Sequence, residues 1–154
     1  MNINIVDRAP ARVAYLRYTG PFGEPLGRFW RGTVAPRLAD LGLIDCPRYG
    51  VPLDDVRNTP ADHCRYDACV ELPPGLTLPD AAQTTIAGGR YAVTHFKGTG
   101  ADIGPAWGAF FAARDRHGPD RDSTRLPFEH YPRGATFDHR TGTFVCELCI
   151  PVRS

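Results

Sequence analysis

The chain lacks the features that mark nucleic-acid-binding, membrane and exported proteins. Lys97 is the only lysine among 18 basic residues, the arginines are scattered, and the formal net charge is +1. Without a basic stripe that could displace counterions from phosphates, we expect no direct contact with nucleic acid. No apolar run approaches the roughly 18 residues of a membrane span, and the N-terminal residues resemble neither a signal peptide nor a transit sequence. We therefore expect a cytoplasmic protein that does not bind membranes.

Signals for metal, redox or cofactor chemistry are also missing. An odd number of cysteines without an export signal favours reduced thiols. Cys146 and Cys149 form a CxxC, but residues 144–150 have the composition of a strand, where positions three apart face opposite sides. That geometry suits neither a disulfide nor two ligands of one metal. The five histidines show no metal-ligand spacing, and P-loop, GxGxxG, HExxH and GxSxG motifs are absent. We expect no metal and no cofactor.

What the sequence does contain is an internal repeat. Residues 12–20 and 90–98 share arginine, alanine, an aromatic residue and glycine in register. An aromatic pair follows in each half, and near the end of each half residues 65–70 and 145–150 share an acid and a cysteine two positions apart. Two copies are too few for a solenoid and indicate a pseudo-symmetric pair. We expect one domain over residues 1–154, with repeat one at about 1–75 and repeat two at about 82–154.

Each copy follows a βαββ pattern. The β-rich segments predict strands at 2–6, 12–18, 48–53, 64–72, 90–96, 127–131 and 143–152, with a further short strand at 84–86. Apolar residues at helical spacing from Leu26 to Leu41 predict a first helix, which Pro36 should kink or split. Ile103, Trp107 and Phe110–Phe111 predict a second helix, closed by residues 117–119 (His-Gly-Pro). The expected fold class is α+β: one largely antiparallel sheet with two helices on one face.

Five blocks of sequence resemble a known family. They are Ala14–Phe22 (AYLRYTGPF), Cys64–Val70 (CRYDACV), Gly88–Val93 (GGRYAV), Pro127–Tyr131 (PFEHY) and Ile150–Val152 (IPV). In this order they are similar to the GyrI-like small-molecule-binding domain, the effector-binding module of many AraC-type and MerR-type regulators, which also occurs free-standing. The resemblance runs from about residue 2 to residue 153. It implies a ligand groove between the two repeats, with Glu129 as the acid at the bottom of the pocket. Unlike those regulators, this chain is expected to contain no helix-turn-helix.

The candidate ligand-binding residues are acids on strands and aromatic residues. An acid in an apolar aromatic setting, such as Glu129, either has a raised pKa or pairs with a cation. Strand alternation places Glu147 on the face opposite Cys146, and either face could line the groove. The aromatic candidates, whose flat rings can stack on a ligand or hold a cation, are Tyr15, Phe22, Tyr91, Trp107 and Tyr131. We assign Trp30 to the core, and Trp107 could serve either role.

Three functional hypotheses follow. We favour a binding domain without enzymatic activity, which captures an apolar small molecule, with cationic aromatic compounds as candidates, in a cleft with an acidic floor. Such a sensor would act by sequestration or through a protein partner such as a transcription regulator. The alternatives implied by the resemblance are a hydrolase of strained, electrophilic genotoxins, with Glu129 as the catalytic residue, and a protein-binding factor similar to gyrase inhibitors.

Overall fold

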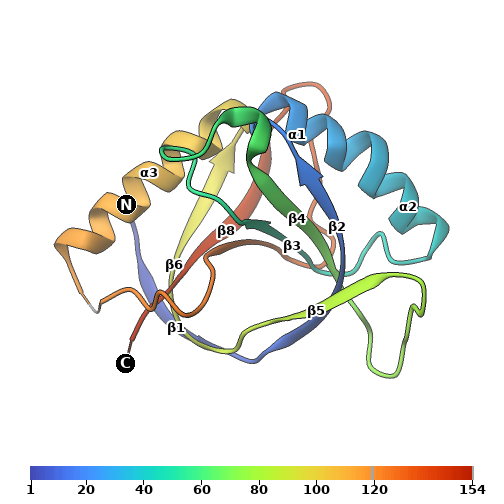
Figure 1. Ribbon diagram of the computed structural model, residues 1–154, viewed down its shortest axis with the longest axis horizontal. Helices are drawn as coiled ribbons and strands as arrows, with labels where there is room; N and C mark the ends of the chain where they lie inside the picture. Colours follow the sequence, from blue (N-terminus) through green and yellow to red (C-terminus); the bar gives the residue numbers. More distant parts are fainter. Residues whose placement is uncertain (119, 154) are drawn as a thin grey trace.

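A single antiparallel sheet organises the fold of the computed structural model, which describes residues 1–118 and 120–153. The sheet has eight strands in the order β1-β6-β8-β7-β3-β4-β2-β5 and curls until β1 and β5 lie below its centre (Figure 1). The strands are β1 Asn4–Arg8, β2 Ala11–Thr19, β3 Arg48–Pro52, β4 Arg65–Glu71, β5 Ala82–Ile86, β6 Gly89–Gly98, β7 Phe128–Tyr131 and β8 Phe144–Pro151. They cover every segment in which the sequence predicts a strand, with ends shifted by at most two residues.

The two halves of the sheet are built alike and exchange their first strands. β1 and β5 begin 78 residues apart, at Asn4 and Ala82, and so do β2 and β6, at Ala11 and Gly89. β1 pairs with β6 of the second half, and β5 pairs with β2 of the first half. The halves meet where β3 pairs with β7 at the middle of the sheet. Residues of both repeats therefore come together along this central seam.

The helices cover the convex face of the sheet on either side of the seam. The first rod contains α1 Glu24–Phe29, a π-helical turn η1 Trp30–Val34 and α2 Ala35–Asp40. The helix is interrupted beside Pro36 but not broken: the π-helical turn runs directly into α2, and Pro36 lies in the first turn of α2. The second helix, α3 Gly100–Arg116, begins with a capping box between Thr99 and Asp102.

The two helical rods converge at the top of the molecule and diverge downward (Figure 1). A 3-10 turn, η2 Ala61–His63, precedes β4. α3 ends before His117 and Gly118, as the sequence predicts, and Gly118 has a positive φ of 80°. Pro119, also predicted to close this helix, lies outside the described residues.

Alternation along the strands gives the sheet two apolar faces. The convex face packs under the helices in two clusters, one around Leu26, Val34 and Leu38 and the other around Phe110 and Leu148. The concave face encloses a third cluster inside the curl of the sheet, which includes Tyr49, Tyr91, Phe128 and Cys149. Because both faces are buried, strand residues on opposite faces belong to different sites.

These observations confirm the predicted fold class, an α+β fold with one antiparallel sheet and helices on one face. The predicted orientation of the CxxC is also confirmed: Cys146 belongs to the cluster under α3, and Cys149 belongs to the cluster inside the curl. Within residues 1–118 and 120–153, no helix is long and apolar enough to span a membrane.

Candidate functional site

A buried carboxylate lies at the central seam of the sheet. Glu129 of β7 pairs with Gly50 of β3 on one side and with Leu148 of β8 on the other. Its side chain points to the convex face, under the helices, and the residue is only 5% exposed. The acid therefore occupies the place where the two halves of the molecule meet.

Three donors from different elements hold this carboxylate. Tyr66 of β4 donates its hydroxyl to Glu129 Oε1 at 2.6 Å, and Tyr131 donates to the same oxygen at 3.0 Å. Trp107 of α3 donates its indole N–H to Oε2 at 3.1 Å. Trp30, from the helix of the other half, donates its indole N–H to Tyr66 Oη at 3.1 Å. Each half thus contributes one tryptophan to a single network centred on Glu129.

Gly50 makes room for this network. A Cβ atom at position 50 would overlap Tyr66 Oη and would lie 2.5 Å from Glu129 Oε1 and 2.6 Å from Tyr66 Cζ. No side chain larger than hydrogen fits there without moving the tyrosine. The first half therefore places a glycine directly opposite the glutamate of the second half.

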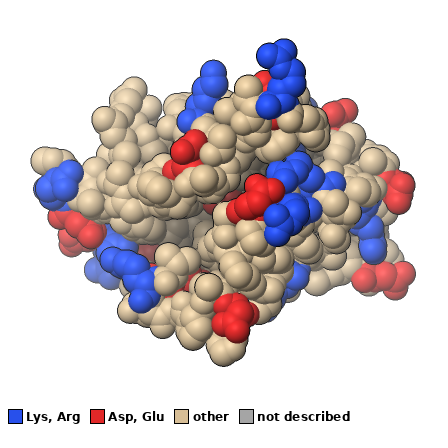
Figure 2. Space-filling model, turned by 90° about the horizontal axis from the view of Figure 1, so that it is seen from above, with Lys and Arg blue, Asp and Glu red and all other residues tan. Residues whose placement is uncertain are grey.

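Aromatic rings surround the carboxylate. Phe22 packs edge-on against Tyr66 with ring centroids 5.8 Å apart, and Trp30 packs against Tyr131 at 5.6 Å. Trp30 and Trp107 are each partly exposed, whereas Tyr66 is fully buried. From the helix side, the surface is hollowed near its centre (Figure 2).

A cavity of about 340 Å³ adjoins the site beneath α3. Its walls include Ala106, which precedes Trp107 in α3, and Leu148, which pairs with Glu129. Its other walls come from residues 1–2 and 94–96, and neither Trp107 nor Glu129 lines it.

The electrostatics of the site follow from its burial. Desolvation raises the pKa of Glu129 above its ordinary value, and the hydrogen bonds from Tyr66, Trp107 and Tyr131 partly offset that rise. Burial and the adjacent Glu129 also raise the pKa values of both tyrosines, so they remain protonated donors.

No cationic side chain of the described residues hydrogen-bonds or ion-pairs with Glu129. The arginine on the same face, Arg48, has its guanidinium carbon 5.7 Å from the centroid of the Tyr131 ring and donates to the carbonyl of Ala135. The carboxylate is thus stabilised by neutral donors only.

The other predicted site residues divide between the two faces of the sheet. Phe22, Trp107 and Tyr131 join Glu129 on the convex side. Tyr15 and Tyr91 pack in or against the cluster inside the curl. Glu147 also faces that side, where it hydrogen-bonds His130 Nδ1 at 2.7 Å. The structure does not bring these last three residues to the Glu129 site.

Three residues of the site were not among the sequence candidates. Tyr66 directly precedes Asp67 in β4, so strand alternation puts the two side chains on opposite faces of the sheet. Alternation does not show which of these faces carries Glu129. Trp30, assigned to the core, packs on core residues and also bonds to Tyr66. Gly50 had no detectable signal, because its role depends on a pairing between strands that are far apart in sequence.

The donor groups around Glu129 do not suit a metal ion. Tyrosine hydroxyls and indole N–H groups supply protons rather than the carboxylate, imidazole and thiolate ligands of protein metal sites. In the described parts of the chain, no group of three or more His, Cys, Asp or Glu side chains could hold a metal. The arrangement suits an organic ligand that contacts rings and a carboxylate.

The chain is similar to known proteins in sequence and in fold. A family model described as the GyrI-like small molecule binding domain matches residues 1–153. The SPbeta prophage-derived protein YosT of Bacillus subtilis (strain 168), whose name places it among transcriptional regulators, is 26% identical over 159 residues, 99% of this chain and 100% of YosT. A DNA gyrase inhibitor of Escherichia coli (strain K12) is 29% identical over 122 residues, 72% of this chain and 73% of the inhibitor.

A solved structure, SAV2435 bound to tetraphenylphosphonium, has a TM-score of 0.65 at 14% identity and covers 100% of this chain and 95% of its own. At that identity the likeness shows the fold alone.

Proposed function

The chain belongs to the family of GyrI-like small-molecule binding domains, and we propose that it binds a lipophilic aromatic cation between its two halves, against Glu129. The observation that carries the proposal is a buried carboxylate, held by three neutral donors, that has no cationic partner in the described parts of the chain. A charge in such a place is costly unless a countercharge arrives with a ligand.

The surroundings of Glu129 suit a delocalised, poorly hydrated cation. Trp30, Trp107, Tyr66 and Tyr131 offer ring faces and edges, and a cation over such a ring gains about 0.5–2 kcal/mol. A hard, well-hydrated ammonium ion would lose more hydration on burial than a phosphonium or pyridinium ion, whose charge is spread over carbon. Tetraphenylphosphonium, the ligand in the SAV2435 structure, belongs to this class.

Access to the carboxylate requires movement of the indole rings. Glu129 is almost fully covered, and Trp107 is bonded directly to its carboxylate. Rotation of Trp107 would exchange this hydrogen bond for contact with the ligand. A net hydrogen bond contributes about 1.5–3 kcal/mol when one partner is charged, so the exchange costs little compared with the ion pair gained.

Isothermal titration calorimetry with tetraphenylphosphonium and the neutral, similarly shaped triphenylphosphine oxide tests the proposal. The wild type should bind the cation more tightly than the oxide, and Glu129→Gln should weaken the cation at least tenfold, about 1.4 kcal/mol, while sparing the oxide. Glu147→Gln, on the opposite face, is the matched control and should leave both affinities unchanged. If Glu129→Gln weakened the binding of both ligands equally, or left the affinity for the cation unchanged, the role of the charge would be refuted.

The geometry also supports a second candidate, hydrolysis of a strained electrophile. A carboxyl whose pKa is raised and which contacts two phenols has the properties of a general acid. In such a reaction water adds its oxygen to a carbon of a strained three-membered ring, the ring bond breaks, and Glu129 protonates the departing carbon or its conjugated oxygen. The attacking water returns a proton to Glu129.

Product analysis separates the two candidates. A hydrolase would convert a cyclopropane-bearing electrophile to its ring-opened alcohol, gaining 18 mass units, and Glu129→Gln would abolish the conversion while binding to neutral ligands survives. A binding protein would leave the compound intact under the same conditions.

A further inference from the structure

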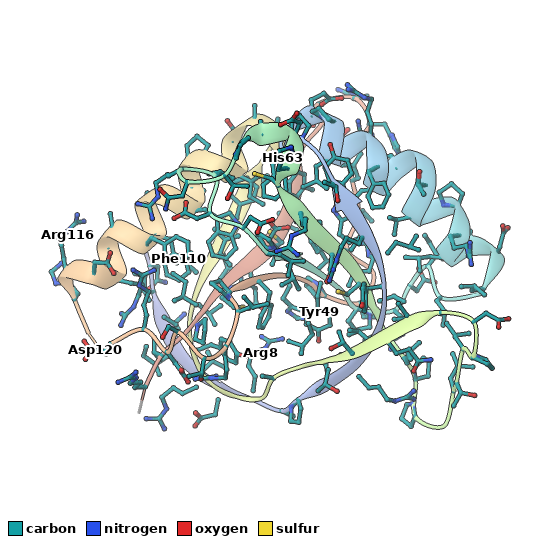
Figure 3. The ribbon with its side chains drawn as sticks, in the orientation of Figure 1. Arg8, Tyr49, His63, Phe110, Arg116 and Asp120 are labelled. Atoms are coloured by element: carbon teal, nitrogen blue, oxygen red, sulfur yellow. The ribbon has the colours of Figure 1, made fainter. Side chains whose placement is uncertain are left out.

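A second hollow lies on the other side of the sheet from Glu129. It has a volume of about 530 Å³ and is lined by the β1–β2 connection, by Tyr49 of β3 and by the segment that follows β4. Figure 3 shows the labelled residues Arg8 and Tyr49 in the space under the sheet, above β1 and β5. We call it the inner hollow; the proposed ligand site against Glu129 does not use it.

Arg8 is a partly exposed cation that lines this hollow. Its side chain is 19% exposed, and its guanidinium carbon lies 5.7 Å from the centroid of the Phe128 ring. Its hydrogen bond from Nη1 to Glu147 Oε1 is long at 3.4 Å, and its guanidinium also interacts with the Tyr49 hydroxyl. Glu147 Oε1 already accepts a 2.7 Å bond from His130. Glu147 is therefore bonded mainly to His130.

The rest of the Arg8 guanidinium borders the hollow, where part of the side chain stays open to solvent. The planar fork of N–H groups of an arginine matches the bidentate geometry of a carboxylate. A second arginine, Arg12, also lines the hollow and donates to the carbonyl of Pro73.

The two acids of the hollow do not occupy this fork. Asp7 points outward to Arg90, with bonds of 3.0 and 3.4 Å, and its side chain is 71% exposed. Glu71 accepts the Tyr49 hydroxyl at 2.7 Å. The rest of the lining, including Ala9, Pro74 and the Tyr49 ring, is apolar.

From this arrangement we infer that the inner hollow is a second ligand site, which takes a small aromatic carboxylate. The carboxylate binds the exposed part of the Arg8 guanidinium, and the ring of the ligand packs against Tyr49 and the apolar residues of the β1–β2 connection. The two sites lie on opposite faces of one sheet and select opposite charges, with an acid for cations on the convex face and an arginine for anions on the concave face.

Benzoate tests this inference in an NMR titration of the ¹⁵N-labelled full chain, with benzamide as the neutral control. Benzoate should cause saturable shifts at the amides of Arg8, Ala9 and Arg12, and benzamide should bind at least tenfold more weakly. Arg8→Met should weaken benzoate by a similar factor. Because Arg8→Met also removes the contact with Glu147, Ala9→Trp provides an independent variant: it fills the hollow from an exposed position without touching an ion pair.

Two results would overturn the inference. One is equal binding of benzoate and benzamide, and the other is benzoate binding that Ala9→Trp leaves unchanged. The test is independent of the cation site, since Glu129→Gln should leave benzoate affinity unchanged and Arg8→Met should leave tetraphenylphosphonium affinity unchanged.

Discussion

Gly50→Ala offers a quantitative test of the network around Glu129. The added Cβ would overlap Tyr66 Oη and approach Glu129 Oε1 to 2.5 Å, so the tyrosine must leave its place. Overpacking in a rigid core costs about 1–3 kcal/mol, and loss of a buried hydrogen bond to a charged group costs about 1.5–3 kcal/mol. The total of about 3–5 kcal/mol is a large part of the stability of an ordinary domain. For a chain of this size it lowers Tm by roughly 10 °C.

Differential scanning calorimetry of two glycine variants measures this effect. Gly108→Ala is the matched control, because Gly108 is an exposed residue of α3 whose Cβ would meet nothing within 4 Å. Alanine is favoured over glycine by about 0.5–1 kcal/mol inside a helix, so this variant should raise Tm slightly. Adding Tyr66→Phe to Gly50→Ala should recover part of the loss, since it removes the overlapping hydroxyl. A Tm for Gly50→Ala within about 2 °C of the wild type would refute the packing described for this site.

Three further predictions concern titration and reactivity. Burial raises the pKa of folded Glu129 above 4.5, so the stability that the protonated group contributes at low pH is lost as the pH rises through the folded pKa. The free energy of unfolding, measured in urea from about pH 4 to 8, should therefore fall in the wild type and not in Glu129→Gln. For Glu147, the hydrogen bond from His130 lowers the pKa, so its stabilisation is present above 4.5 and is lost as the pH falls through the lowered pKa. Glu147→Gln should therefore cost about 1–2 kcal/mol at neutral pH and progressively less in acid, and a constant cost across the pH range would contradict this assignment. All five cysteines are buried, and burial raises the pKa values of Cys69 and Cys149 to about 12, so a thiol reagent should label none of the five in the folded protein and all of them in urea.

The fold was readable from the sequence because the repeat and the strand alternation are local signals. The echo between residues 12–20 and 90–98 places β2 and β6 in equivalent positions, and Pro36 indicates an interruption in the first helix. The exchange of β1 and β5 between the halves was not predicted. It depends on pairing between residues more than 60 positions apart, for which a single sequence carries no register signal.

The site was only partly readable, for a related reason. Strand alternation decides which residues share a face, but it cannot say which face carries the helices. That ambiguity placed Tyr15, Tyr91 and Glu147 beside Glu129 as candidates, although their strands turn them into the curl. Trp30 resembled a core residue because it lies among apolar residues at helical spacing. The hydrogen bond from its indole N–H to Tyr66 depends on the position of β4, which the helix pattern does not reveal.

The two tryptophans allow the most direct test of the proposed binding site, because the chain has no others and both contact the network around Glu129. A titration with tetraphenylphosphonium that follows tryptophan emission should show a saturable change in the wild type, with the midpoint measured by calorimetry. Heat of binding without any change in the emission of either indole would place the cation elsewhere and would contradict the site at the central seam.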